Sequence, residues 1–459
     1  MKWERLLDKN RRRKSTSSGD HRAEFERDFD RAVFSTPVRR LQDKAQVFPL
    51  DPHDAIRTRL THSLEVSSVA RGLATAIAKW LSDQQIIEPG MDRSIEVIAA
   101  TSGLIHDLGN PPFGHAGEDA IRAWFGNYFE TIGLPPEFRD NAQATEDFRK
   151  FDGNAQSLRL VAKLQVLADN YGLNLTFGTL SASCKYTAPS HEATLNAADH
   201  AARKPGYFAS ENGVIKEIRD ATGTGTARNP ITFLVEAADD IVYSVADIED
   251  GVKKGIVSWR MVSDMLSPDT DINVKSALDS MDSILRSGRD ARPDDLPDDI
   301  LASGFRTAAI GILARSVIDE FKNRYHSIMA GTYGGELVKD CGAATFCSCL
   351  KRIGGERIYC TPPTLKLEIM GRHVIKDLMT LFWEGAKVLP LDKQPDTKRF
   401  PGKIGALLSE NYRRIFRQFV KSDPTLPEVY HRFQLVTDYV CGMTDSFAKR
   451  LHSEVTNGN

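Results

Sequence analysis

The chain has 459 residues, of which 41% are hydrophobic and 27% are charged, and its formal net charge is −2. This composition predicts an ordinary soluble globular protein with room for two or three domain-sized units, and it excludes a strongly basic protein that coats nucleic acid. No apolar run reaches the roughly 18 to 20 residues that span a bilayer, and no apolar secretory signal follows the N-terminus. We therefore expect a cytoplasmic protein with no membrane partner.

The first 34 residues are expected to form an N-terminal arm. Its dense basic run, Arg11 to Lys14, is interpreted as a solvated, mobile tail. Six cysteines are too few to form a disulfide framework for a chain of this length, so we expect reduced thiols. A zinc site between Cys341 and Cys360 is the less favoured alternative.

The apolar spacing in the next part of the chain predicts two helices that carry histidines. Apolar side chains recur every three or four positions from 64 to 80, and His62 precedes them on the same inward face. A second helix is predicted over 95–105. It delivers His106 and Asp107 at its end, where Gly109 and a double proline stop it.

A third helix is predicted over 231–252. Asp239, Tyr243 and Asp247 are spaced four residues apart in it and so form one polar stripe. The Gly- and Thr-rich stretch 222–230 in front of it is interpreted as a mobile loop.

The remaining segments give a mainly α protein with minor β content. We expect short strands at 206–216 and 356–369, and helices at 305–325 and 374–389. The charged, proline-containing stretch 287–299 is the best linker candidate. The predicted organisation is an arm (1–34), a core (35–286) and a C-terminal mainly helical region packed on the core (300–459).

The predicted helices offer a set of nitrogen and carboxylate ligands in the order His, His-Asp, Asp. Taken alone, His62 is more often a helix cap or a core residue, and the pair Asp239-Asp240 is more often an exposed charge pair. A hydrolytic metal site needs ligands from several elements, because one helix turn presents only two on one side. The combined order therefore favours a metal site, and it is the signature of the HD-domain phosphohydrolases.

Longer motifs extend this resemblance to a narrower family. The chain resembles the bacterial deoxyguanosinetriphosphate triphosphohydrolases in a series of segments that follow in family order, with weaker likeness at KLEIMG (366–371), KRFP (398–401) and CGMTD (441–445). The main segments are RRLQDKAQVFPL (39–50), RTRLTHSLEV (57–66), HDLGNPPFGHAGE (106–118), FDGNAQSLRLV (151–161), KYT (185–187), KPGYF (204–208) and EAADDIVYSVADIEDGV (236–252).

The resemblance implies a helical HD-domain fold, a homo-oligomer (a hexamer in the closest type) and hydrolysis of a dNTP to deoxynucleoside and inorganic triphosphate. It implies a divalent metal ion, with Mn²⁺ or Mg²⁺ favoured. The implied catalytic pair is His115 and Glu118, for which a simple helix-dipole role of Glu118 is the alternative. The implied metal ligands are His62, His106, Asp107 and Asp239.

The resemblance also implies the residues that hold the substrate. Arg59 and Lys185 match phosphate-contacting positions, and Glu368 matches one near the guanine edge, where a solvated strand acid is the alternative. The stretch DKQPDT (392–397) departs from the family pattern, which puts guanine selectivity in doubt. The positions implied around the sugar and the same pocket are Gln46, Val47, Tyr186, Tyr243 and Asp247.

We therefore expect a metal-dependent triphosphohydrolase that acts on dGTP. One alternative is an enzyme with a broader dNTP range. The other is a regulator that responds to nucleotides or single-stranded DNA, with Arg11 to Lys14 contacting phosphates and hydrolysis secondary.

Overall fold

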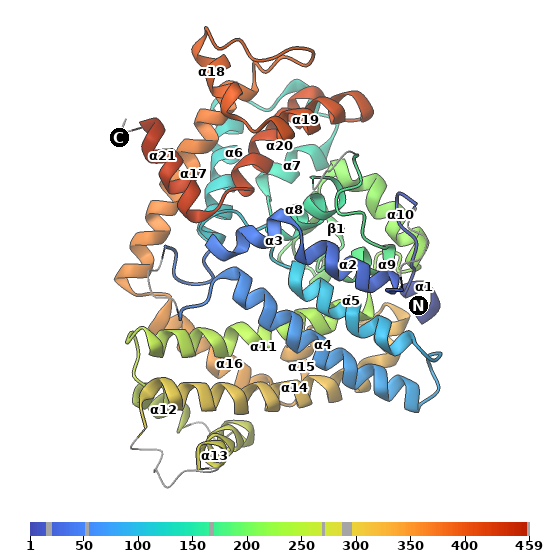
Figure 1. Cartoon of the computed structure of the whole chain (residues 1–459), viewed down its shortest axis with the longest axis vertical. Coiled ribbons are helices and arrows are strands. Elements are labelled where there is room, and N and C mark those ends of the chain that lie inside the picture. Colours follow the sequence, from blue (N-terminus) through green and yellow to red (C-terminus); the bar gives the residue numbers. More distant parts are fainter. Residues whose placement is uncertain (15–20, 51–54, 165–168, 269–270, 287–295, 457–459) are drawn as a thin grey trace.

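The protein is seen in a computed structural model, which describes residues 1–14, 21–50, 55–164, 169–268, 271–286 and 296–456. It is mainly helical, as the apolar spacing predicts (Figure 1). The elements from the N-terminus to the second strand are α1 (Trp3–Leu6), α2 (Glu24–Val33), α3 (Thr36–Arg40), η1 (Leu41–Asp43), α4 (Arg59–Asp83), α5 (Met91–Ile105), α6 (Gly114–Thr131), η2 (Pro136–Phe138), α7 (Ala142–Arg149), α8 (Gly153–Arg159), the π-helix η3 (Leu160–Leu164), α9 (Phe177–Ala182), β1 (Ala188–Pro189), η4 (His200–Ala202) and β2 (Pro205–Tyr207).

The second half of the chain is again helical. Its elements are η5 (Ala209–Glu211), α10 (Asn212–Thr222), α11 (Pro230–Lys253), α12 (Trp259–Leu266), α13 (Ile272–Arg286), α14 (Asp298–Ala330), α15 (Leu337–Asp340), α16 (Ala344–Ile353), the π-helix η7 (Gly354–Ile358), α17 (Pro362–Ala386), α18 (Phe400–Leu407), α19 (Glu410–Ser422), α20 (Glu428–Cys441) and α21 (Asp445–Thr456).

Helices α4, α5, α11 and α14 form the larger apolar core. Thr58 caps α4 by accepting a hydrogen bond from the amide of Thr61, and Asn229 caps α11 in front of a proline in its first turn. Helix α11 packs between α4 and α14 (Figure 1). This arrangement fixes the direction of the polar stripe on α11 relative to the start of α4.

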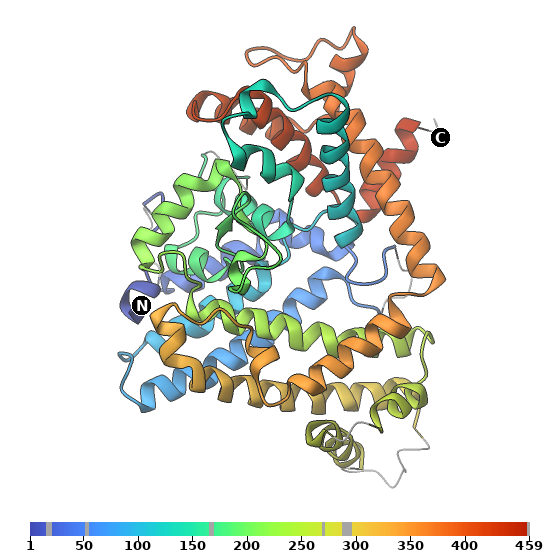
Figure 2. The ribbon, with the colours of Figure 1, turned by 180° about the vertical axis from the view of Figure 1, so that it is seen from behind.

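A second apolar core lies in the other half of the molecule, where α6 packs on α17 and α20 packs on α17 and α19. Aromatic rings fill it, with Phe125, Phe148 and Phe433 in mutual contact. Helix α17 runs from the α11 layer up along this second core (Figure 2).

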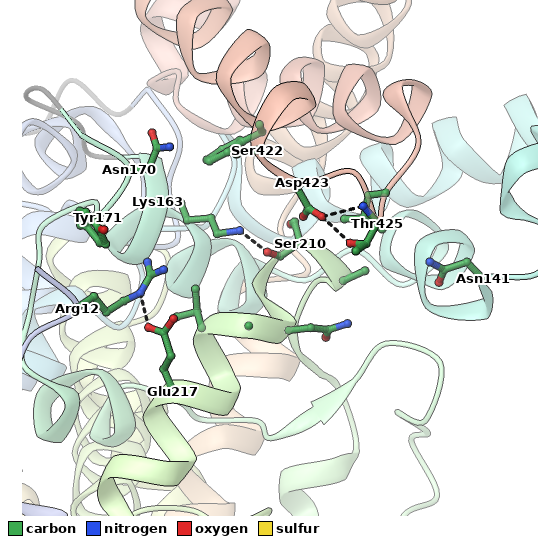
Figure 3. A pocket seen from close by; sticks show the side chains of 16 residues that line it. Arg12, Asn141, Lys163, Asn170, Tyr171, Ser210, Glu217, Ser422, Asp423 and Thr425 are labelled. Atoms are coloured by element: carbon green, nitrogen blue, oxygen red, sulfur yellow. Dashed lines mark hydrogen bonds and ion pairs between the residues drawn. The ribbon is translucent and has the colours of Figure 1, made fainter.

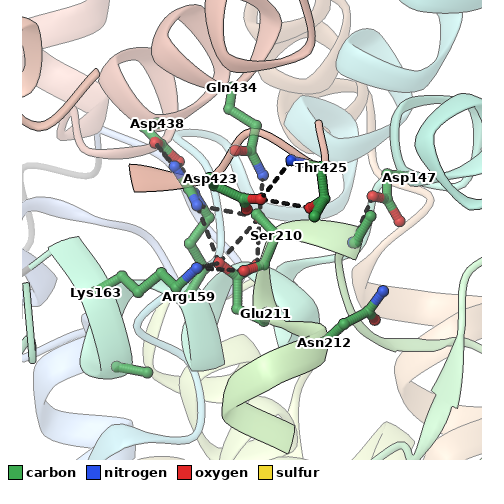
Figure 4. Close-up of polar contacts among 12 residues, drawn as sticks. Asp147, Arg159, Lys163, Ser210, Glu211, Asn212, Asp423, Thr425, Gln434 and Asp438 are labelled. Atoms are coloured by element: carbon green, nitrogen blue, oxygen red, sulfur yellow. Dashed lines mark hydrogen bonds and ion pairs between the residues drawn. The ribbon is translucent and has the colours of Figure 1, made fainter. Parts of the chain in front are cut away.

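A buried charge network joins α20 to the first half of the chain (Figure 4). The Arg159 guanidinium donates to both Asp438 oxygens, at 2.7 Å from Nη2 and 2.8 Å from Nε, and it also donates to Glu211 at 3.0 Å. All three side chains are at most 4% exposed. Removing one partner of a buried ion pair leaves an uncompensated charge inside the protein, which destabilises the fold. This network therefore holds α20 against the first half of the chain.

We expect Asp438→Ala to lower the free energy of unfolding by about 3 to 5 kcal/mol, because it leaves the Arg159 charge buried with less compensation. The measurement is urea unfolding followed by circular dichroism. Asp83→Ala is the matched control, since Asp83 pairs with Lys79 on the surface and its loss should cost at most about 0.5 kcal/mol. Equal losses for the two variants would contradict this role for the network.

Several expectations from the sequence are wrong. The arm is packed rather than mobile at its basic run, since buried Arg11 pairs with Asp28 at 2.5 Å and Arg12 pairs with Glu217 at 2.8 Å. The stretch 222–230 joins α10 to α11 and is pinned by buried Arg228, so it is not a loose loop.

The strand predictions fail over most of their length. Residues 205–207 do pair in parallel with β1, but 212–222 is helix α10 and 356–369 covers the end of η7 and the start of α17. The linker candidate 287–299 lies largely outside the described residues, which resume at 296.

Helix α14 is long and apolar enough to cross a membrane by length and composition alone, contrary to the expectation that no apolar run reaches this length. Its apolar side chains, Phe305, Leu313 and Phe321 among them, are buried in the first core against α11 and α13. Half of the most apolar stretch of α14 is buried within the protein, and α14 packs as a core helix.

Candidate metal and nucleotide site

His62 and His106 lie together because α4 and α5 approach closely. A Cβ atom on Gly103 would come within 2.9 Å of the Ser67 backbone, so only glycine permits this contact. The two imidazole centroids are 5.5 Å apart. His106 follows the last residue of α5, and its Nδ1 is 2.7 Å from the Gly103 carbonyl, which leaves Nε2 pointing into the site.

Asp239 comes from α11 to meet both imidazoles. Its Oδ1 lies 3.2 Å from His62 Nε2 and 3.5 Å from His106 Nε2. Asp107 Oδ1 lies 3.6 Å from His106 Nε2. His62, His106 and Asp107 present ligand atoms within 4.8 Å of one another. The four residues chosen from the sequence therefore meet at one place.

The electrostatics of this cluster follow from its burial and its mixture of charges. Burial lowers the pKa of His106, but Asp107 and Asp239 outweigh it and raise the pKa to about 9. Burial would raise the pKa of Asp239, but the two histidines and Lys185 hold it well below its usual range. The carboxylates are thus ionised at neutral pH and favour a cation beside them.

The residues fit a divalent metal ion. The buried His106 Nε2 has no hydrogen-bond partner, although it faces two carboxylates. Imidazole nitrogens and carboxylate oxygens are ligands that Mn, Mg, Fe, Co and Zn ions share. The donor set therefore indicates a divalent ion and leaves its identity open.

Asp107 is held by neighbours on both of its oxygens. Asn110 Nδ2 donates to Oδ1 at 2.7 Å, and the Arg59 guanidinium donates to Oδ2. Burial raises the pKa of Asp107, but His106 and Arg59 lower it to about 2. Such outer partners fix the orientation of a ligand.

The loop after Asp107 is packed too tightly for any residue larger than glycine at 109. A Cβ there would lie 2.2 Å from the Gly153 carbonyl oxygen and from the Ser157 amide nitrogen of α8. The amide of Gly109 instead donates to Ser157 Oγ at 2.8 Å. Glycine at 109 therefore serves close packing and not a special backbone angle.

Helix α6 begins at an unusual turn. Phe113 and Gly114 both have positive φ, 63° and 56°, a conformation that costs energy for phenylalanine. The Phe113 amide donates to Asp445 Oδ1 at 2.9 Å, and Asp445 Oδ2 accepts from the Ala45 amide at 2.9 Å. The C-terminal CGMTD segment thus holds two loops of the site.

This turn aims His115 and Glu118. His115 Nδ1 is 2.9 Å from Glu118 Oε2, and Gly153 N donates to Glu118 Oε1 at 2.7 Å. Glu118 is 4% exposed, whereas His115 is 85% exposed. The hydrogen bond that His115 donates to the Glu118 carboxylate raises the pKa of His115 above its ordinary value. The pair therefore presents an oriented imidazole to the cavity.

These side chains line a cavity of about 540 Å³. It is lined by every site residue expected from the sequence except His62, whose Nε2 lies 3.2 Å from Asp239 Oδ1. Glu368 lines it from α17 and is a helical residue, not the strand residue expected. The remaining lining side chains that sequence reasoning had proposed are Gln46, Val47, Arg59, Lys185, Tyr186, Tyr243 and Asp247.

Other cavity residues were missed. Lys204 approaches Asp152 at 3.3 Å and lies 6.0 Å from the Tyr186 ring, so it adds a cation near His115. It stands in the segment KPGYF, and that motif was its only signal. Tyr359 donates its hydroxyl to Asp247 Oδ2 at 2.5 Å and had no signal.

Burial raises the pKa of Asp247 to about 7, although the hydrogen bond from Tyr359 opposes this shift. Asp247 thus lies in a buried part of the cavity, where it accepts the hydrogen bond from Tyr359. It lies two turns beyond Asp239 on α11, as the spacing predicts.

A second group, His200 with Glu236 and Glu336, consists of residue types that can bind a metal ion. Glu236 already pairs with Arg228 at 2.6 Å, and Glu336 pairs with Lys339. The charges balance without a metal ion. The His200 ring lies 5.7 Å from that of Tyr186, so this group supports the wall of the cavity.

A separate cavity of about 620 Å³ lies near α10 and α19 (Figure 3). Its cations are engaged, since Arg12 pairs with Glu217 and Lys163 donates to the Ser210 carbonyl. Asp423 also lines it. It shares no lining residue with the smaller cavity and brings together none of the metal-ligand candidates.

Comparison with known proteins gives the family. The HD domain family matches residues 59–165, which contain His62, His106, Asp107, His115 and Glu118. HD domains are metal-dependent, and the chain holds a candidate metal-binding group within this match.

Relatives match nearly the whole chain. A deoxyguanosinetriphosphate triphosphohydrolase-like protein of Listeria innocua is 37% identical, with 99% of each chain covered. A deoxyguanosinetriphosphate triphosphohydrolase of Yersinia pseudotuberculosis is 32% identical, with 92% of each covered. A probable one of Pseudomonas aeruginosa is 32% identical over 93% of this chain and 91% of its own. The chain therefore belongs to the deoxyguanosinetriphosphate triphosphohydrolase family of HD-domain enzymes.

Proposed function

We propose that this protein hydrolyses dGTP to deoxyguanosine and inorganic triphosphate with a divalent metal ion as cofactor. The observation that carries the proposal is the convergence of His62, His106, Asp107 and Asp239 beside the His115–Glu118 pair in one cavity. The names of the relatives support the substrate. We further propose that the protein acts in the cytoplasm as a homo-oligomer, with a hexamer expected.

His62, His106, Asp107 and Asp239 would hold the metal ion. The chemistry that such an ion supplies is polarisation of a phosphoryl oxygen and activation of water, for which Mn²⁺ and Mg²⁺ are both suitable. Arg59 Nε is buried without a hydrogen-bond partner and lines the cavity, so it has capacity for a phosphate.

Cations on the cavity wall would bind the triphosphate, which carries about four negative charges at neutral pH. Arg59, Lys185 and Lys204 line the cavity together. Lys185 lies 3.7 Å from Asp239 Oδ2, so a phosphate bound by it would lie next to the metal ligands. Charge-assisted hydrogen bonds of this kind are the stronger ones.

Hydrolysis would break the bond between the 5′ oxygen and the α-phosphorus. The oxygen of water joins the phosphorus, and the leaving 5′ oxygen takes a proton. His115 would transfer this proton, because Glu118 orients its ring and favours the protonated form. Glu118 is itself fixed by the Gly153 amide and so acts as the positioning residue.

The sugar would lie along the stripe on α11. Asp247 would accept from the 3′ hydroxyl. The side chain of half-buried Gln46 would be a second partner, since its buried Oε1 has no hydrogen-bond partner among the described residues. The Tyr243 ring would pack against C2′, where a ribose 2′ hydroxyl would collide with it. Val47 and Tyr186 would complete this wall.

The base would lie toward Glu368, whose carboxylate could accept from the guanine edge. The departure at 392–397 from the family pattern makes a broader dNTP range the alternative. Hydrolysis of each dNTP with Mn²⁺, with Mg²⁺ and with EDTA tests the proposal. Turnover of dGTP that is fastest of the four and abolished by EDTA is expected. EDTA-resistant turnover would contradict the proposed cofactor.

A regulator that binds single-stranded DNA through the basic run has less support. Arg11 and Arg12 are committed to carboxylates in the packed arm, and Arg13 lies 2.6 Å from Asp169. Adding single-stranded DNA to the dNTP assay at low and high salt checks this role, because binding to phosphates weakens steeply with salt.

We expect Tyr243→Ala to reduce the preference for dGTP over GTP, measured as the ratio of the two kcat/KM values, by roughly tenfold or more. The reason is loss of the ring that excludes a 2′ hydroxyl. Tyr243→Phe is the matched control, since it keeps the ring and should keep the ratio. A ratio that stays unchanged in the alanine variant refutes the steric explanation.

A further inference from the structure

Lys351 reaches α11 from outside the cavity. It lies near the end of α16, and its Nζ is 2.7 Å from Asp240 Oδ1 and 4.9 Å from the centroid of the Tyr243 ring. Both partners line the cavity, whereas Lys351 does not. One ammonium therefore contacts the carboxylate next to the ligand Asp239 and the ring proposed to face the sugar.

The contact with Asp240 affects the charge of the cavity. Asp239 and Asp240 are neighbours on a helix, so their side chains diverge by roughly 100° and only one can face a given ion. The Asp240 side chain is 13% exposed and lines the same cavity as Asp239. A free carboxylate there would repel a triphosphate, and Lys351 neutralises it.

The contact with Tyr243 restricts the ring. An ammonium over an aromatic face is attracted to it, more strongly when the pair is partly removed from water. The Lys351 side chain is 27% exposed, and Asp240 holds its ammonium at the ring. Tyr243 is thereby held in one orientation from the side of α16, while it also lines the cavity.

We propose that Lys351 is a positioning residue that sets substrate affinity by neutralising Asp240 and sets sugar selectivity by holding the Tyr243 ring. This inference deepens the proposed function and rests on it. It assigns a role to a helix, α16, that supplies no side chain to the cavity lining.

The test uses Lys351→Met and the double variant Lys351→Met with Asp240→Asn in the full-length protein. For the single variant we expect the KM for dGTP to rise about tenfold with kcat within about threefold of wild type. The preference for dGTP over GTP should fall about fivefold, a change within the range of one cation–π contact. Metal content, measured by mass spectrometry, should not change.

The double variant separates the two roles. Removing the Asp240 charge should bring the KM for dGTP back to within about threefold of wild type, while the sugar preference stays low because the ammonium is still missing. The double variant also leaves no unpaired charge at this position. If the single variant fails to fold, the preference for dGTP over GTP is therefore measured on the double variant. Lys79→Met, which breaks a surface pair with Asp83, is the matched control and should change neither quantity.

Wild-type KM and wild-type sugar preference in Lys351→Met would overturn the inference while leaving the proposed function intact. Loss of the metal ion in that variant would also overturn it, because Lys351 would then serve the metal site. If the wild-type protein releases no triphosphate from any dNTP, the proposed function fails and this inference fails with it.

Discussion

Replacing Asp107 with alanine is expected to remove the bound metal ion and to lower kcat by about a thousandfold or more. Asp107 adjoins the imidazole nitrogen of His106 and carries a full negative charge, since its pKa lies near 2. A bound metal ion contributes several kcal/mol to a phosphoryl-transfer transition state, and each 1.4 kcal/mol is a factor of ten in rate.

The measurement is metal content per chain together with the rate of triphosphate release from dGTP. Asp119→Ala is the matched control, because Asp119 is an exposed acid in the adjacent helix α6 that pairs with Arg122. It should keep both metal and activity. An Asp107→Ala protein that folds, keeps its metal and turns over at the wild-type rate would contradict the assigned ligand set.

Replacing His115 with glutamine should lower kcat by a factor of about 10² to 10⁴ while metal content stays at the wild-type level. His115 lies outside the candidate metal-binding group, and its Nδ1 is hydrogen-bonded to Glu118. Loss of metal together with activity would place His115 in the metal site and contradict its role in proton transfer. His326→Gln, on the exposed side of α14, is the control.

The same pair predicts a pH dependence. Glu118 raises the pKa of His115, so the protonated form persists above its ordinary pKa of about 6.5. If protonated His115 supplies the proton, kcat is constant below the raised pKa and falls as the pH rises through it. In Glu118→Gln the pKa of His115 should drop, and the alkaline fall in kcat should move to lower pH. An alkaline fall that stays in place shows that another group controls it.

The helices that carry the candidate metal ligands could be predicted because their apolar spacing is regular. The structure places α4, α5 and α11 over the predicted ranges, and His106-Asp107 follows α5 directly. The secondary-structure predictions failed where a short run of residues fits both the strand period and the helix period. The alternation at 356–369 suggested a strand, yet Pro362 and Pro363 start α17, where a missing amide hydrogen costs nothing.

Residues 212–216, at the start of helix α10, were mistaken for the end of a strand for a similar reason. The buried side chains Val214, Ile215 and Ile218 form one face of this short helix, and so few apolar positions do not separate the two periods. The basic run at 11–14 was interpreted as solvated because its acidic partners lie elsewhere in the chain. Asp28, which pairs with Arg11, stands in a segment that carries no motif.

The cavity shows the same division. Most of the site residues found from the sequence stand in motifs, although Lys204 in KPGYF was missed. Tyr359, and Lys351 just outside the cavity, come from the junction of α16, η7 and α17, whose packing on α11 has no local signal. Glycine at 109 is explained only by the backbone of α8 beside it. Such contacts depend on tertiary packing, which the spacing of residues along the chain does not determine.

The most direct test of the proposed reaction is hydrolysis of dGTP in ¹⁸O-labelled water with Mn²⁺, followed by mass spectrometry of the products. Attack on the α-phosphorus predicts one ¹⁸O atom in inorganic triphosphate, unlabelled deoxyguanosine, and no reaction with EDTA. Label in deoxyguanosine, or products such as dGMP with pyrophosphate, would contradict it.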